Sequence, residues 1–86
     1  MTGLMIIIAR DLAAAELFAE RMREEGLAVE VFADLSAGKI RLAEEPVDVL
    51  AVDAGLVDEE GSRLIEWAMR EGRTNVAIRF GGKGAL

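Results

Sequence analysis

The sequence predicts an α/β fold: a three-layer arrangement in which four parallel strands, in spatial order 2-1-3-4, are covered by three helices. Short apolar stretches alternate along the chain with longer amphipathic segments, and aspartates precede these segments while glycines or a proline follow them. Right-handed crossovers turn such an alternation into a parallel sheet with helices on both faces.

Four stretches are expected to form strands, at residues 4–9, 28–32, 47–53 and 75–80. The first and third carry apolar residues at both alternating sets of positions, as strands covered on both faces do, and so belong in the middle. The second alternates Val29 and Val31 with Glu30, which predicts an edge strand. The winding then reverses between the first and third strands.

The first two helices are expected to begin at an aspartate N-cap, the third to start near Asp58, and each helix to end at a glycine or a proline. The two caps are Asp11 and Asp34, and the helices continue to Glu25, to about Glu45, and to the residues before Gly72. The predicted inner faces are Ala14, Leu17, Phe18 and Met22, then Ala37, Ile40 and Ala43, then Leu64, Ile65, Ala68 and Met69. Trp67 lies outside the third stripe, either as a partly exposed anchor for a partner or packed on the helix flank.

Composition excludes several classes of function. The 86 residues hold 16 acidic and 10 basic side chains, and the net charge of −6 opposes nucleic acid or an anionic membrane as partner and favours a basic protein surface. Without cysteine or histidine, thiolate sites, cysteine nucleophiles and histidine bases are excluded, and neither cofactor nor metal is expected. The longest apolar run is too short to span a bilayer and no signal-like start precedes it, so the chain is expected to be cytoplasmic.

Ligands of such a sheet collect at the carboxyl ends of the strands, where the winding reverses. The residues expected there are Arg10, Asp11, Asp53, Phe80 and Lys83. Across the reversal point from Asp53, the Arg10 guanidinium could form a charge-assisted pair that neutralises the carboxylate without a metal.

Several spacings resemble the receiver domain of bacterial response regulators, from Leu4 to about Gly81. They are the stretch from Arg23 to Val29, Asp48 and Asp53 within the third strand, and Gly61 followed by Leu64. The resemblance implies a flavodoxin-like, receiver-like form truncated after the fourth strand, a role in signal transduction, and Asp53 at the position of the phosphoacceptor aspartate.

The sequence departs from that family where magnesium and phosphate would bind. Ala9 and Arg10 stand in place of the family's acidic pair, and Phe80 in place of its hydroxyl residue. The family's last lysine has no aligned counterpart, although Lys83 could occupy that space. We therefore expect a non-enzymatic, receiver-like protein-interaction module that is not phosphorylated by the usual magnesium-dependent route.

Other functions stay open on the sequence alone. Asp53 could be an active phosphoacceptor in two-component signalling or serve a small flavodoxin-like enzyme, and the reversal point could bind a nucleotide. Gly81 to Gly84 fit a flexible glycine-rich tail, at 81–86 behind a domain at 1–80, better than a phosphate loop, because no Ser or Thr and no helix follow Lys83. Asp58, Glu59 and Glu60 fit a first helical turn better than a metal cluster.

The predicted ending after the fourth strand leaves that strand at an edge and one face of the sheet bare beyond strand one. A symmetric homodimer is expected, through strand pairing or face packing. The contact residues would be Val76, Ile78, Arg79 and Phe80, with Arg79 facing an acidic residue of the second copy. An excised fragment of a longer protein would expose the same surface.

Overall fold

Four parallel strands and three α-helices alternate along the chain, as the sequence predicts. In a computed structural model, residues 3–56 and 58–80 are described. The elements are β1 (Leu4–Ile8), α1 (Leu12–Glu24), β2 (Ala28–Phe32), α2 (Leu35–Glu44), β3 (Val47–Asp53), a short 3-10 turn η1 (Ala54–Leu56), α3 (Glu59–Arg70) and β4 (Thr74–Phe80). The strands lie in the order β2-β1-β3-β4, which confirms the predicted sheet and is consistent with a flavodoxin-like fold.

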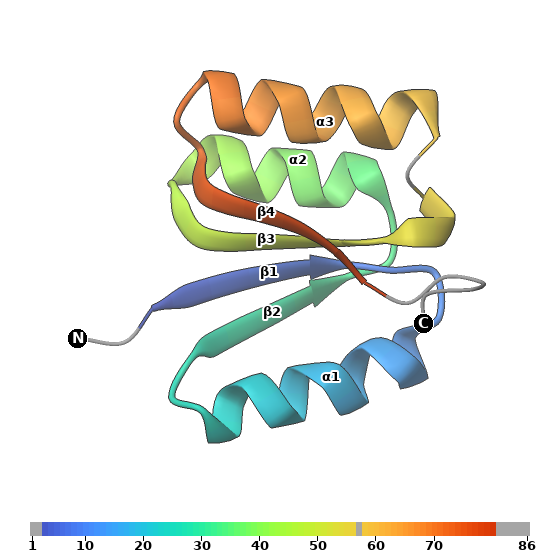
Figure 1. Ribbon diagram of the computed structural model, residues 1–86, viewed down its shortest axis with the longest axis vertical. Helices are drawn as coiled ribbons and strands as arrows, with labels where there is room; N and C mark the ends of the chain where they lie inside the picture. The colour runs from blue at the N-terminus through green and yellow to red at the C-terminus, as the bar shows by residue number, and fades with distance from the viewer. Residues whose placement is uncertain (1–2, 57, 81–86) are drawn as a thin grey trace.

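The sheet is parallel throughout and has helices on both faces. Leu4 lies opposite Ala28 in β2, and Met5 lies opposite Val49 in β3. Figure 1 shows α2 and α3 on one side of the sheet and α1 on the other, with all three helices starting at the edge where the strands end. The helix N-termini and the carboxyl ends of the strands therefore share one edge of the molecule.

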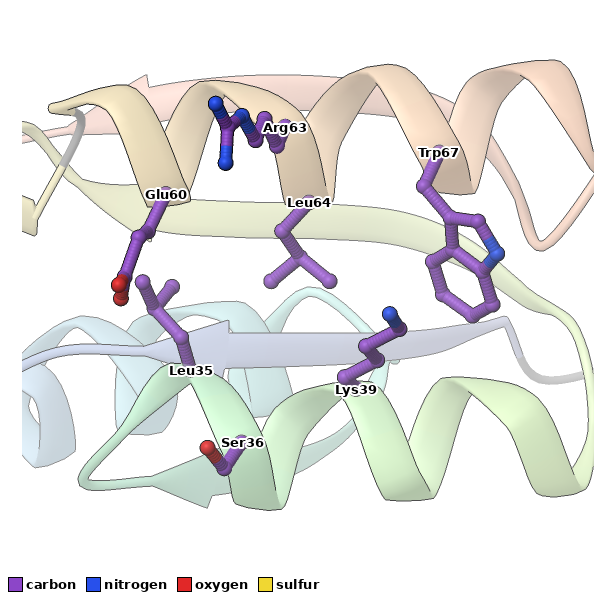
Figure 2. Close-up of a pocket in the computed structure, with 7 residues that line it drawn as sticks. All are labelled: Leu35, Ser36, Lys39, Glu60, Arg63, Leu64 and Trp67. Atoms are coloured by element: carbon purple, nitrogen blue, oxygen red, sulfur yellow. The ribbon is translucent and has the colours of Figure 1, made fainter.

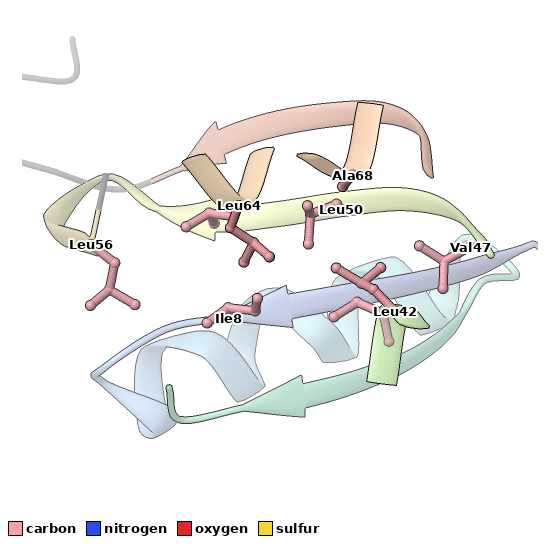
Figure 3. Close-up of a cluster of buried hydrophobic side chains, with 9 residues drawn as sticks. Ile8, Leu42, Val47, Leu50, Leu56, Leu64 and Ala68 are labelled. Atoms are coloured by element: carbon pink, nitrogen blue, oxygen red, sulfur yellow. The ribbon is translucent and has the colours of Figure 1, made fainter. Parts of the chain in front are cut away.

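The larger core fills the space between the sheet and the pair α2 and α3. Ile6 and Ile8 of β1 and Leu50 and Val52 of β3 are fully buried there (Figure 3). The helices and flanking turns contribute Leu42, Val47, Leu56, Leu64 and Ala68. Because β1 and β3 send side chains to both faces, their opposite positions, among them Met5, Ile7 and Ala51, form a second core under α1.

The buried face of α2 differs from the prediction. Gly38 and Leu42 face the core, whereas Ile40 is 65% exposed and Ala43 is also exposed. A Cβ on Gly38 would overlap the side chain of Ile8, so the missing side chain is what lets this face approach β1 closely. The helix α2 therefore packs on the sheet through Gly38 and Leu42 rather than through the predicted Ala and Ile stripe. Of that stripe, Ala37 is half-buried.

The other two helices also deviate from their predicted stripes. In α1 the buried residues are Ala15 and Ala19, while Ala14 is exposed and Leu17 is 66% exposed. Small residues at the contact let the helix axis approach the strands, and Phe18 and Met22 pack from the flank. In α3, Leu64 and Ala68 are buried and Ile65 packs beside them, but Met69 is 47% exposed.

Both predicted glycine stops are confirmed. Gly26 and Gly72 have φ angles of 99° and 67°, in the left-handed region that a side chain would disfavour. The N–H of Leu27 reaches back to the carbonyl of Met22, and the N–H of Arg73 reaches the carbonyl of Ala68. These bonds pair carbonyls that the helix ends would otherwise leave free, and they turn the chain into β2 and β4.

Ion pairing joins α2 to the edge strand β2. The Arg41 guanidinium donates to both carboxylate oxygens of Glu30, at 2.8 and 3.1 Å, and to Glu45 at 2.9 Å. The Arg41 side chain is 14% exposed, and the hydrogen bonds that it donates to Glu30 raise the pKa of its guanidinium above the ordinary value. This contact covers the polar side of β2, where the sequence predicts Glu30 to face away from Val29 and Val31.

Candidate functional site

The edge at which the strands end carries four aspartates, three of which begin helices. Asp11 and Asp34 are the N-caps of α1 and α2, as predicted, and Asp58, near which the third helix is expected to start, is the N-cap of α3. Their carboxylates accept the N–H groups of Ala14, Ala37 and Gly61 at 3.1, 2.8 and 3.1 Å. Each of these carboxylates thus has a structural partner in its own helix.

Asp53 ends β3, half-buried, at the position where the resemblance puts a phosphoacceptor. Its Oδ1 accepts the N–H of Gly55 at 2.9 Å, which stabilises the turn into η1. Across the sheet it lies opposite Phe80 of β4. No ion pair within 4.0 Å joins Asp53 to Arg10 in the described residues, so the charge-assisted pair that the sequence allows is not formed.

Arg10 instead lines a hollow of about 290 Å³ between the ends of β1 and β2 and the start of α3. The carboxylates that line this hollow are Asp34, Asp58 and Glu60. The N–H of Gly61 is the main cause that holds the pKa of the Asp58 carboxyl below its ordinary value, against a smaller effect of desolvation, and the charge of Arg10 lowers it further. The positive charge of Arg10 therefore acts on the Asp58 carboxylate, which caps α3, rather than pairing with the Asp53 carboxylate, which ends β3.

In the part of the chain that the structure describes, the carboxylates at this edge are not gathered into a metal-binding group. Among residues 3–56 and 58–80, no group of three or more acidic side chains is arranged to hold a metal ion. The physical reason is that the caps turn their oxygens toward their own helices, while Arg10 brings a positive charge into the hollow between them.

The remaining predicted site residues separate into different places. Asp11 is exposed and caps α1, and Phe80 lies in the core under α1, where its ring centroid is 5.0 Å from that of Phe18. Phe80 is therefore a packing residue rather than a member of the hollow. Lys83 and the predicted tail at 81–86 lie outside the described residues.

The predicted contact residues of β4 alternate as expected along the strand. Val76 is 48% exposed, and Ile78 and Phe80 are half-buried on the α1 side of the sheet. Arg79 is exposed on the opposite set of positions. This face is less bare than predicted, because Phe18 reaches across from α1 and packs against Phe80.

A groove between α2 and α3 was missed by the sequence reasoning. It has a volume of about 210 Å³ and is lined by Leu35, Ser36, Lys39, Glu60, Arg63, Leu64 and Trp67 (Figure 2). It shares Leu35, Ser36 and Glu60 with the hollow beside Arg10, so the two form one continuous depression. The one signal for it in the sequence is Trp67, which lies off the predicted core stripe of its helix.

Lys39 and Trp67 form one end of this groove. The Lys39 Nζ lies 5.1 Å from the centroid of the indole ring, a cation–π contact between α2 and α3. Trp67 is half-buried and packs against the core, which bears out packing on the helix flank while leaving part of the ring accessible. Glu60 lies at the opposite end (Figure 2).

The chain matches no protein-family model, no curated protein and no solved structure. In the described part of the chain, no helix has both the length and the apolar character required to cross a bilayer.

Proposed function

We propose that the chain is a non-enzymatic, receiver-like module that binds a protein partner and does not use magnesium-dependent phosphorylation as its switch. The observation that carries the proposal is Arg10, which follows the end of β1 by two residues and stands where the resemblance would require an acidic side chain to hold magnesium. A role in signal transduction, which the resemblance implies, and a cytoplasmic location, which the short apolar runs favour, belong to the same proposal. Cell fractionation of the native host tests the location.

The surroundings of Asp53 support this function. Phosphoryl transfer to a carboxylate requires a cation that neutralises the charge developing on the phosphoryl oxygens. Arg10 shares its hollow with Asp34, Asp58 and Glu60, and no ion pair within 4.0 Å joins it to Asp53 in the described residues. One Asp53 oxygen already accepts the N–H of Gly55. The carboxylate is thus engaged in a turn, and the two residues that follow β1 are Ala9 and Arg10 rather than the acidic pair that the resemblance would require for magnesium.

Incubation with acetyl phosphate and magnesium, followed by intact mass measurement, tests the absence of phosphorylation. Wild type is expected to gain no adduct, and Asp53→Asn is the matched control. A variant with Ala9→Asp and Arg10→Asp restores the acidic pair, and if the resemblance holds it should acquire a labile phosphoryl adduct that Asp53→Asn abolishes. A labile adduct on Asp53 of the wild-type chain would overturn the proposal in favour of an active phosphoacceptor.

The proposed module is a symmetric homodimer formed through the α1 side of β4. In support, Val76 is 48% exposed on this side of the sheet, in a row with the half-buried Ile78. Apolar side chains at a sheet edge are unfavourable in water and are commonly covered by a second chain. Sedimentation velocity at tens of micromolar is expected to give a dimer, and a monomer would refute this part of the proposal.

A further inference from the structure

The groove between α2 and α3 has an apolar floor and oppositely charged ends. Leu35 and Leu64 form the floor, and the indole of Trp67 forms one wall. At the Trp67 end the ammonium group of Lys39 lies over the ring, with no carboxylate within 4.0 Å of it among residues 3–56 and 58–80. The two positive groups of the groove differ, because Arg63 is already paired with Glu59 on its own helix whereas Lys39 is not.

The other end of the groove is negative. Glu60 stands there, and the depression continues into the hollow lined by Asp34 and Asp58. Three carboxylates face the single guanidinium of Arg10 in that hollow. A bound segment would therefore meet a cation at one end, apolar surface in the middle, and excess negative charge at the other end.

The two helices that line the groove favour one backbone conformation for a peptide segment bound in it. Both walls are α-helices, whose backbone N–H and C=O groups are bonded within the helix and offer nothing to an extended segment. An extended peptide would gain no backbone hydrogen bonds from these walls and would leave its backbone groups to water, whereas a helix satisfies its own groups internally. The groove therefore fits a helix lying along α2 and α3.

The length of the groove sets the spacing of the charges on that helix. Glu60 and Trp67 are seven residues apart on α3, which corresponds to about 10.5 Å along the axis, or two helical turns. A docked helix therefore needs an acidic residue at position i for Lys39, apolar residues at i+3 and i+4 for Leu35, Leu64 and Trp67, and a basic residue at i+7 for the Glu60 end. This order also suits the dipole of the docked helix, which favours acidic residues near its N-terminus and basic residues near its C-terminus.

We infer that the α2–α3 groove is a docking site for an amphipathic helix of a protein partner, bound antiparallel to α3 with its acidic end at Lys39 and its basic end at Glu60. This inference rests on the proposed function, because it names the surface and the chemistry through which the module would bind its partner. The Asp53 region takes no part in it.

The test uses the intrinsic fluorescence of Trp67, the single tryptophan of a chain without tyrosine. The probe is an alanine-based helical peptide of about 15 residues that carries Glu at i, Leu at i+3 and i+4, and Lys at i+7. A second peptide carries the two charges exchanged. The matched peptide is expected to change Trp67 emission saturably, and the exchanged peptide to bind about fivefold or more weakly.

The variant Lys39→Glu with Glu60→Lys is expected to reverse that preference. Circular dichroism establishes that the variant is folded, and Leu17→Ser on the exposed side of α1 is the control that should bind like wild type. Equal emission changes with both peptides, or no change with either, would overturn the inference. An emission change on raising the concentration of the protein alone would show that a second copy occupies the groove, and this too would overturn it.

Failure of the inference and failure of the proposed function are distinguishable. The peptide titration is repeated after incubation with acetyl phosphate and magnesium, with the mass of the protein measured in parallel. Charge-selective binding with an adduct on Asp53 refutes the proposed function and supports the groove. Absence of both binding and adduct refutes the groove and leaves the non-phosphorylated module standing.

Discussion

Gly61, in the first turn of α3, lies directly against the backbone carbonyl of Leu56, so that a Cβ at this position would overlap the carbonyl oxygen and carbon. Gly61 is buried and donates its N–H to the Asp58 carboxylate at 3.1 Å. The turn that leaves β3 is therefore folded back onto the start of α3, and this close approach requires a residue without a side chain.

Gly61→Ala is expected to destabilise the protein, although alanine is the better helix former. The methyl group would meet backbone atoms that cannot rotate away, and overpacking of this kind costs about 1–3 kcal/mol. Gly55→Ala is the matched control, because a Cβ there would be in ordinary contact with Asp53. Urea unfolding followed by Trp67 fluorescence measures both variants, and equal stabilities would contradict the close approach.

The folded protein is expected to lose stability in acid as the Asp58 carboxylate takes up a proton. The N–H of Gly61 holds the pKa of this carboxyl in the folded protein below its unfolded value. The stabilisation is complete above the unfolded pKa of roughly 3.9 and is lost as the pH falls through the folded pKa. Asp58→Asn keeps the cap without a titrating group, so it should match wild type near neutral pH and lose less stability between about pH 4 and pH 2. Parallel acid dependence in the two proteins, followed by circular dichroism, would show that the Asp58 cap does not titrate as expected.

Arg41 is expected to contribute more to stability than Arg63. Arg41 is 14% exposed and donates two hydrogen bonds to Glu30 across elements, whereas Arg63 is 70% exposed and pairs with Glu59 one turn away. Lysine cannot reproduce the two parallel bonds, so Arg41→Lys should cost about 1 kcal/mol. Arg63→Lys should change the free energy of unfolding by less than about 0.5 kcal/mol. A comparison of thermal unfolding midpoints checks both values, and an equal effect would show that the Arg41 pair gains nothing from its burial.

The order of the elements could be predicted from the sequence because its signals are local. Asp11, Asp34 and Asp58 cap the helices that follow them, and Gly26 and Gly72 end two of the helices as expected. The strand order followed from which strands are apolar at both alternating sets of positions. Such signals lie within a few residues of the structure that they specify.

The buried helix faces and the site depended on contacts between distant residues. Gly38 faces the core because Ile8 fills the space where its side chain would be, which no pattern within α2 indicates. The sequence allows a pair between Arg10 and Asp53, at the ends of neighbouring strands, but Arg10 instead lines the hollow beside Asp34, Asp58 and Glu60. The α2–α3 groove depends on the distance between two helices that the sequence does not specify.

Val76→Lys is expected to weaken the proposed homodimer. Val76 is 48% exposed on the α1 side of β4, so a lysine would point into water in the monomer and leave its core intact. In the dimer, however, its ammonium group would have to lose water against apolar side chains or face a second lysine across the two-fold axis. The dimer dissociation constant measured by sedimentation equilibrium should rise by about tenfold or more.

Asn75→Lys adds the same charge to the other face of the strand and serves as the control for face packing. Equal dissociation constants for Val76→Lys and wild type would exclude the α1 side of β4 as the contact, while an effect of both substitutions would favour pairing of the β4 edges over packing of the faces.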